Sequence, residues 1–198
     1  MRWYLIKTWA GREEALAEEL KNVLPYGLYH ECFTIYHERI WRKQQRSIVH
    51  TELLFPGCVF LTCEEGAEYL NIIKRNYLAA ERDKYTNPAI FPLMQEDAKF
   101  LEAISGKDHL VRLSYVDKDE QGRICRLSEP LKLCQGQIKR IQYKKRFAMV
   151  HHRLWGENLV MVLGIVLKED TGPMFLTKDV GKDVECREND LEETGVAF

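Results

Sequence analysis

Apolar residues in the first hundred positions recur first at strand spacing and then at helix spacing. The aromatic and aliphatic run at 3–8 predicts a strand. Apolar residues at helix spacing also predict short helices over 67–75 and 95–104. A longer helix is predicted over 12–24, because four apolar residues are spaced i, i+4, i+7 and i+8 along it: Leu16, Leu20, Val23 and Leu24.

The stretch 53–61 joins two apolar runs through a Pro-Gly pair. Its second run, 58–61, has the length of one buried strand. Proline cannot donate a hydrogen bond to a sheet ladder, so Pro56 is expected at the start or edge of that strand. Gly57 is expected to allow a sharp turn or the close approach of another backbone segment.

The segment 32–50 has the pattern of a long hairpin with a strongly basic tip at 42–46. Two interpretations of the tip stay open: a solvated end that keeps a sheet edge soluble, or a contact to nucleic acid. The order strand, helix, two strands, helix predicts an α+β sandwich in which helices cover one face of an antiparallel sheet.

The second half of the chain is dominated by strand patterns. A polar segment with a glycine at 105–108 is the best candidate for a linker. Beyond it, 110–116 alternates with period two and is followed by a polar turn at 117–122. Closely spaced short strands then predict a small β-barrel, with strands expected from Ile124 onward and over 137–141, 147–151 and 159–166.

Composition places the chain among ordinary soluble proteins, with 198 residues, 45% hydrophobic and 30% charged. No apolar run approaches the roughly 18 residues of a membrane-spanning helix, and no secretory signal opens the sequence. We therefore expect a cytoplasmic protein without membrane association. The six cysteines include no C-x-x-C pair and no zinc-like Cys/His spacing, so we expect structural thiols, no metal site and no cofactor.

The net charge of −1 conceals an uneven distribution. Between 130 and 168, eight lysines and arginines stand against a single acid, Glu157, whereas 169–198 holds nine acids and three cations. A basic segment followed by an acidic one predicts a surface for a polyanion and a solvated or competing tail.

Two groups of motifs, in this order, resemble the NusG family of transcription elongation factors, over about 1–167. The first group is similar to the N-terminal NGN domain of the family: Trp3-Tyr4, Gly11-x-Glu13 and Leu54-Phe55-Pro56-Gly57-x-Val59-Phe60. The second is similar to its KOW domain: Glu129-Pro130-Leu131-Lys132, Ile138-Lys139-Arg140-Ile141, Lys144-Lys145-Arg146 and Trp155-Gly156. The basic run before an aliphatic strand looks most like the LoaP branch of specialised NusG paralogues.

The resemblance implies four segments along the chain. An NGN-type α/β sandwich would occupy 1–106, a linker or hairpin 107–123, and a five-stranded KOW β-barrel 124–170. The remaining segment, 171–198, would be an acidic tail without a counterpart in the family.

The sequence departs from the family pattern at several positions. The family usually has a tyrosine after the Pro-Gly pair, and this chain has Cys58. Two glycines usual at the start of the KOW domain are replaced by Glu129 and Leu133. A turn that needs positive φ would strain Leu133, so Gly136 is expected to take over that role.

The resemblance implies that the NGN domain docks on the clamp helices of bacterial RNA polymerase through an exposed apolar depression. The alternative is that its aromatic residues belong to the core. Because strand neighbours alternate faces, we expect one of Phe55 and Phe60 to be exposed. The implied polymerase-binding residues are Tyr4, Phe55, Cys58 and Phe60.

Two basic sets are candidates for nucleic acid. In the hairpin, phosphate contacts to DNA near the transcription bubble would involve Arg39, Arg42, Lys43 and Arg46. In the KOW segment, cations mix with a stackable ring, which suits RNA: Lys139, Arg140, Tyr143, Lys144, Lys145, Arg146, His151 and Arg153. The alternatives for this second set are a solvated face or a face that recruits a ribosomal protein. His151 and His152 are strand neighbours, so only one of them is expected on the face.

The function implied by the resemblance is operon-specific transcription antitermination, with RNA polymerase and a structured RNA hairpin as partners of a monomeric factor. Two alternatives stay open: a general NusG-type elongation factor that couples to the ribosome, and a stand-alone KOW RNA-binding protein of translation. The sequence has no Gly-x-Ser-x-Gly, no phosphate-cradling glycine loop and no paired metal motif. We therefore expect no enzymatic activity.

Overall fold

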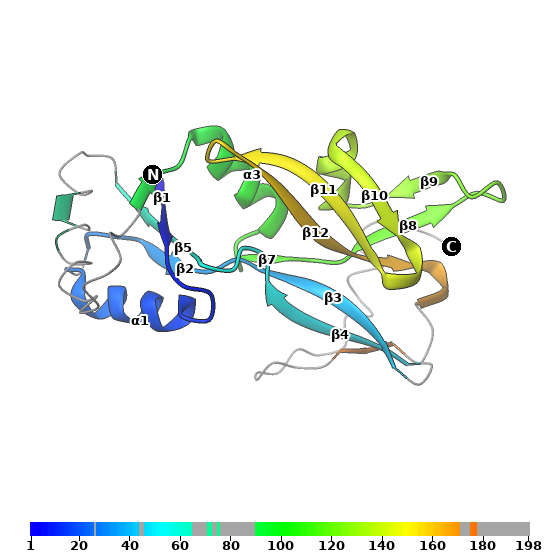
Figure 1. Ribbon diagram of the computed structural model, residues 1–198, viewed down its shortest axis with the longest axis horizontal. Helices are drawn as coiled ribbons and strands as arrows, with labels where there is room; N and C mark the ends of the chain where they lie inside the picture. The colour runs from blue at the N-terminus through cyan, green and yellow to red at the C-terminus, as the bar shows by residue number, and fades with distance from the viewer. Residues whose placement is uncertain are drawn as a thin grey trace.

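The computed structural model describes residues 1–25, 27–43, 46–64, 71–72, 75, 90–170 and 175–177, and for 42, 43, 46 and 175–177 it describes the backbone alone. Strands form three sheets, with α-helices beside the first of them (Figure 1). The predicted helix over 67–75 and most of the predicted acidic tail at 171–198 lie outside the described residues.

The first sheet organises the N-terminal half and is antiparallel, with strand order β2-β5-β1-β6. Every residue of β5 is buried, because apolar clusters cover the sheet on both faces. The predicted strands at 3–8 and 58–61 are confirmed as its two central strands. The four strands are β1 (Arg2–Lys7), β2 (Glu31–Phe33), β5 (Cys58–Cys63) and β6 (Ile90–Pro92).

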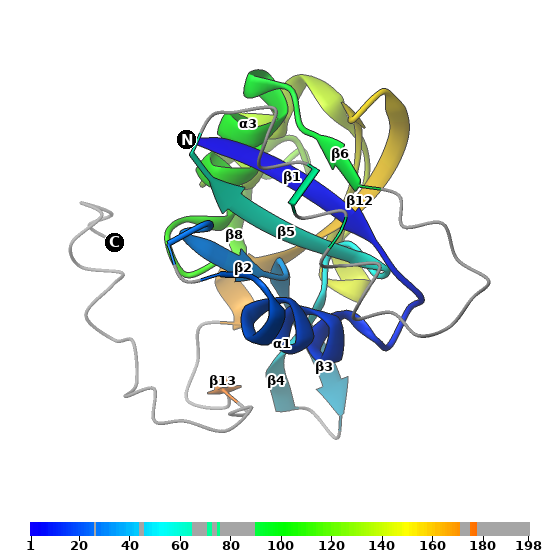
Figure 2. The same ribbon diagram turned by 90° about the vertical axis from the view of Figure 1, so that its left-hand side faces the viewer.

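Helices α1 (Glu13–Val23) and α3 (Gln95–Ser105) lie on opposite faces of this sheet (Figure 2). Helix α1 packs on the face that carries Tyr4, whereas α3 packs on the face that carries Trp3 and Phe60. The prediction that helices cover one face alone is wrong. The physical reason is that consecutive apolar residues, 3–6 in β1 and 58–61 in β5, point to both faces of the sheet. Both faces must therefore be shielded from water.

Helix α1 buries the apolar stripe that its spacing predicts, with one exception. Leu16 and Leu20 are fully buried and Leu24 is nearly so, whereas Val23 remains 39% exposed. Ala17 is buried in the stripe instead. The buried stripe thus consists of Leu16, Ala17, Leu20 and Leu24.

The Pro-Gly pair forms the turn that leads into β5, as predicted. Gly57 has φ +77°, and a Cβ on it would lie 2.8 Å from the carbonyl oxygen of Thr8. The turn is fixed to the first strand and to α1, because the amide of Thr8 donates to the Gly57 carbonyl at 2.9 Å. The buried carboxylate of Glu13 accepts from the Gly57 amide at 2.6 Å. Gly57 therefore serves both expected purposes.

A second sheet, of order β13-β4-β3-β7, contains the predicted long hairpin as strands β3 and β4. Residues 32–33, which we expected at the start of this hairpin, belong to β2 of the first sheet instead. The strands of the hairpin sheet are β3 (Tyr36–Lys43), β4 (Arg46–Leu53), β7 (Leu110–Val111) and β13 (Phe175–Thr177).

The third sheet has five strands in the order β10-β11-β12-β8-β9. The resemblance implies a five-stranded barrel in 124–170, whereas β8 lies before this segment, so the barrel stays a prediction. Three short 3-10 helices accompany the sheet: η1 (Leu131–Gln137), η2 (Tyr143–Lys145) and η3 (Lys168–Asp170). Its strands are β8 (Ser114–Lys118), β9 (Ile124–Leu127), β10 (Ile138–Gln142), β11 (Phe147–Leu154) and β12 (Glu157–Leu167).

The alternating segment at 110–116 is divided between two sheets. Strand β7 pairs in parallel with β3 of the hairpin sheet, and after two residues β8 pairs in parallel with β12 of the five-stranded sheet. Part of the segment predicted as a linker or hairpin at 107–123 is thus a sheet strand, and the turn after it closes the β8–β9 hairpin. The exact domain limits stay a prediction.

The expected role of Gly136 is wrong. Leu133 and Gly136 both lie within η1, and Gly136 is absent from the glycines with positive φ. A 3-10 turn has ordinary negative φ angles, so Leu133 is accommodated there without a glycine.

A single apolar cluster connects the two halves of the chain. It includes Trp3 and Phe60 of the first sheet together with Leu131, Leu154 and Ile165 of the second half. Strand β12 also crosses β3 closely, because a Cβ built on Gly164 would lie 2.2 Å from the carbonyl oxygen of Glu38. The halves are therefore in direct backbone contact.

Candidate nucleic-acid interface

The five-stranded sheet presents a cationic face on neighbouring strands. In the antiparallel register, Arg140 of β10 lies opposite Met149 of β11, so its side chain shares a face with His151 and Arg153. Val160, opposite His151 on β12, is 51% exposed and lies next to His151 on this face. This arrangement gives a surface that carries two arginines and a histidine, with an exposed apolar residue on the neighbouring strand.

Seven of the eight predicted RNA-binding residues reach the surface. Tyr143 is half-buried at the start of η2, and six polar residues are exposed: Lys139, Arg140, Lys144, Lys145, His151 and Arg153. We call this set, with Tyr143, the basic face. It spans β10, η2 and β11, which are consecutive in the chain and hydrogen-bonded where they are strands.

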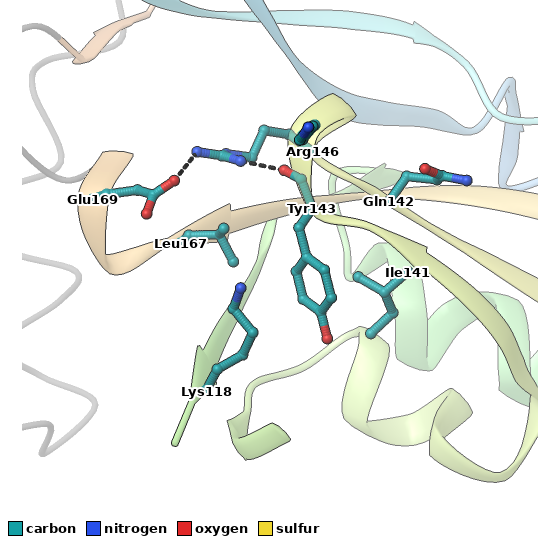
Figure 3. Close-up of a pocket in the computed structure, with 8 residues that line it drawn as sticks. Lys118, Ile141, Gln142, Tyr143, Arg146, Leu167 and Glu169 are labelled. Atoms are coloured by element: carbon teal, nitrogen blue, oxygen red, sulfur yellow. Dashed lines mark hydrogen bonds and ion pairs between the residues drawn. The ribbon is translucent and has the colours of Figure 1, made fainter. Parts of the chain in front are cut away.

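Arg146 is a correction, because the structure buries it. Its side chain is 2% exposed and is held by Asp170, with Nε 2.5 Å and Nη2 2.9 Å from the carboxylate oxygens. Nη2 also donates to Glu169 at 2.6 Å, and Nη1 donates to the carbonyl of Tyr143 (Figure 3). With φ +55°, Arg146 turns inward at the bend between η2 and β11. The positive charge of Arg146 is therefore paired with carboxylates of the same chain and does not belong to the exposed cationic surface.

The two adjacent histidines face opposite sides, as expected. His151 is exposed on the basic face, whereas the ring of His152 stacks on Phe100 at 3.8 Å between centroids. Nδ1 of His152 lies 2.8 Å from the side-chain oxygen of Gln137. Burial lowers the pKa of His152, although the carboxylate of Asp97 opposes the shift. Only His151 belongs to the face.

The predicted DNA-binding hairpin is described in part. Arg39 does not point freely into solvent: its Nη1 lies 3.0 Å from Glu52, and its guanidinium carbon lies 5.2 Å from the ring centre of Phe147 on β11. Arg39 thus attaches the hairpin to the five-stranded sheet. The side chains of Arg42, Lys43 and Arg46 lie outside the described part, so their DNA contacts stay a prediction.

Trp41 is a surface aromatic residue that the sequence analysis did not single out. It is 61% exposed and its ring centre lies 3.8 Å from that of His50 on the paired strand. The signal was present in the sequence, since a tryptophan in a basic hairpin is a ring suited to stacking. Its exposure could not be read from the sequence.

Because His37 on the same hairpin is buried, we expect the stability of the protein to depend on pH. Burial lowers the pKa of His37 from 6.5 to about 4, although Glu52 acts in the opposite direction; Arg39 and His50 also lie near and favour the neutral ring. Below pH 6.5 the unfolded state takes up a proton that the folded state does not, so stability falls as the pH falls toward 4.

Between pH 7 and 5, His37 is expected to lower the free energy of unfolding by about 2 kcal/mol. Urea unfolding of the wild type and His37→Gln at both pH values measures this difference, because the variant lacks the titrating group. Equal losses in the two proteins would contradict the assignment.

The four residues implied to bind RNA polymerase are not brought together on the surface. Phe55 and Cys58 are 7% and 3% exposed, and Tyr4 and Phe60 are buried almost completely. Tyr4 lies on the α1 face, whereas the other three lie on the opposite face. The expectation that either Phe55 or Phe60 is exposed is wrong, because both point toward the second half of the chain.

Trp155, in the turn between β11 and β12, covers these phenylalanines. Its ring centre lies 5.3 Å from that of Phe55 and 6.4 Å from that of Phe60. The backbone amide of Trp155 donates to Asp97 of α3 at 2.8 Å, and Lys7 Nζ lies 5.2 Å from the indole ring. The motif residues Trp155-Gly156 thus pack on the motif residues of the first half.

The described thiols are free, and most are core residues. Cys32, Cys58, Cys63 and Cys134 are buried, whereas Cys125 is exposed. Burial raises the pKa of Cys32 to about 12 and that of Cys134 to about 11. In the part of the chain covered by the structure, no helix is long and apolar enough to span a membrane. Across the same residues, no group of three or more His, Cys, Asp or Glu side chains is arranged to hold a metal.

Comparisons with known proteins find matches among solved structures, but none among family profiles or curated sequences. Among solved structures, the chain is similar to "Domain interaction in Thermotoga maritima NusG", with a TM-score of 0.37 and 16% identity. The similarity covers 82% of this chain and 93% of that chain.

Proposed function

We propose that this chain is a NusG-type transcription factor of the LoaP-like kind, which promotes elongation and antitermination on a particular operon. It binds bacterial RNA polymerase through its N-terminal half and a structured RNA hairpin through the basic face. The proposal is supported by two motif groups in the family order. A five-stranded sheet also lies where the KOW-like motifs occur.

The basic face is the observation that carries the RNA part of the proposal. Arg140, His151 and Arg153 share one outward face, and the exposed Lys144 and Lys145 lie next to it in η2. Cations combined with a stackable ring suit single-stranded or looped RNA, whose bases are open to contact. The density of positive charge favours a polyanion over a neutral partner.

Polymerase binding is assigned to the N-terminal half as a whole, because the four residues implied by the resemblance are buried. Exposed apolar side chains in this half offer contact area instead: Trp9 and Met94 are each 67% exposed, and Phe91 is 47% exposed. Large apolar side chains on a surface favour protein contacts. Such a factor acts through binding free energy alone, by favouring one state of the polymerase.

RNA binding is tested by the fluorescence anisotropy of a labelled RNA hairpin and a DNA duplex of equal length at matched salt. We expect tighter binding to the hairpin. Arg140→Ala should weaken it about three- to tenfold and reduce the salt slope by about 0.7 to 0.9. Lys21→Ala is the matched control, because Lys21 lies on α1, which covers the opposite face of the first sheet. No preference for the hairpin would contradict the RNA part.

The polymerase part is tested by capture of the tagged full chain from a bacterial lysate. RNA polymerase is expected to co-purify with it in the presence of nuclease. Recovery of ribosomal proteins without polymerase would instead favour a role in translation. Phe60→Ala is unsuitable here, because a fully buried aromatic residue is expected to fail through unfolding.

A further inference from the structure

A pocket of about 440 Å³ opens at the end of the five-stranded sheet, beside the basic face (Figure 3). It lies between η2 with the end of β10 on one side and the ends of β8 and β12 on the other. Its lining residues are Lys118, Ile141, Gln142, Tyr143, Lys144, Arg146, Leu167 and Glu169. Tyr143 and Lys144 also belong to the basic face, whereas Lys118 does not.

The pocket combines an aromatic ring with a cation. Nζ of Lys118 lies 4.1 Å from the ring centre of Tyr143, a cation–π contact between β8 and η2. Ile141 and Leu167 give apolar contact area around the ring (Figure 3). Lys118 is exposed, and a lysine side chain with four rotatable methylenes can leave the ring for another partner.

The backbone of Tyr143 is held in place by Arg146. Its carbonyl accepts hydrogen bonds from Nη1 and from the backbone amide of Arg146, and Glu169 and Asp170 fix the guanidinium. A backbone that is ordered before a ligand arrives costs less conformational entropy on binding. The burial of Arg146 thus gives the pocket a rigid wall.

Charge in the pocket favours a phosphate on one side. The charge of Arg146 is balanced by Asp170 and Glu169, and Glu169 is 65% exposed at the rim. Lys118 and the exposed Lys144 supply positive charge to the lining. A phosphate is therefore attracted to the lysines and repelled from the Glu169 side.

We propose that this pocket takes one unstacked nucleobase of an RNA strand bound on the basic face. The base stacks on the ring of Tyr143, and Lys118 moves from the ring to the adjoining phosphate. Every base has a π-face, so this subsite contributes affinity with little dependence on sequence. The inference rests on the proposed RNA binding and adds Lys118, from a distant strand, to the contact surface.

The test uses the full chain and a single-stranded oligoadenylate RNA that carries one 2-aminopurine and an end label. Tyr143→Ala is expected to weaken binding about tenfold and to remove the fluorescence change of the 2-aminopurine. Tyr143→Phe, which retains the ring, should bind within about twofold of the wild type. Lys118→Ala should reduce the salt slope by about 0.7. Circular dichroism and thermal melts show that each variant is folded.

Several results would overturn the proposal. Wild-type affinity in Tyr143→Ala, or equal losses in Tyr143→Ala and Tyr143→Phe, would remove stacking from the explanation. Binding of free AMP as tightly as the RNA would assign the pocket to a free nucleotide, and Tyr143-dependent capture of a protein would assign it to a protein. If the wild type binds no RNA, the proposed function fails as well. If the wild type binds RNA and the Tyr143 variants bind it with unchanged affinity, the pocket assignment fails and the proposed function stands.

Discussion

Arg146→Ala is expected to lower the free energy of unfolding by about 3–5 kcal/mol. The substitution leaves the carboxylate of Asp170, 1% exposed, without its partner in a site closed to water. It also removes the side-chain donor to the carbonyl of Tyr143, so the turn between η2 and β11 keeps only the backbone hydrogen bond from residue 146. Urea unfolding measures the loss.

Lys145→Ala is the matched control for this prediction, because Lys145 precedes Arg146 in the chain and its side chain is exposed. This substitution is expected to lower the free energy of unfolding by at most about 0.5 kcal/mol. The double variant Arg146→Ala/Asp170→Ala should recover part of the stability, since no buried charge is then left unpaired. An Arg146→Ala protein with wild-type stability and lost RNA binding would mean that Arg146 contacts the ligand.

Gly164→Ala is expected to lower the free energy of unfolding by about 3 kcal/mol or to prevent folding. The new methyl group would lie 2.2 Å from the carbonyl oxygen of Glu38 and 2.6 Å from a methyl carbon of Leu113. Backbone atoms cannot rotate away, so β12 must separate from β3. Thermal and urea unfolding both report this loss.

Gly136→Ala is the matched control, because nothing lies within 4 Å of a Cβ at that position and the residue is exposed. Its stability should stay within about 0.5 kcal/mol of the wild type or rise slightly, since alanine restricts the unfolded chain. Equal behaviour of the two alanine variants would show that the crossing of β3 and β12 is looser than the structure has it.

The elements could be predicted from the sequence because their signals are local. Spacing of apolar residues located α1, α3 and the strands of both halves to within a few residues, and the Pro-Gly pair marked the start of β5. What covers each face could not be predicted. Phe55 and Phe60 are buried by Trp155, about a hundred positions away, and no local pattern reports that contact.

Most residues of the candidate site could be predicted from the sequence, but Arg146 was included wrongly and Lys118 was missed. The basic run near η2 reads as three equivalent cations, yet Lys144 and Lys145 are exposed while Arg146 is buried. The difference comes from the left-handed backbone at Arg146 and from Asp170, which stands 24 positions later. Lys118 was missed because its relation to Tyr143 exists only in the folded chain.

The segment 110–118 contributes one strand to each of two sheets, and this limits how the halves of this chain could be joined to those of another in a chimera. Strand β7 completes the hairpin sheet and β8 completes the five-stranded sheet, with two residues between them. A chimera joined at 106 would take both strands from the donor of the second half, and one joined at 123 would take both from the donor of the first. Either junction would pair a strand with a foreign sheet. Surface substitutions should therefore be tolerated more readily than an exchange of halves.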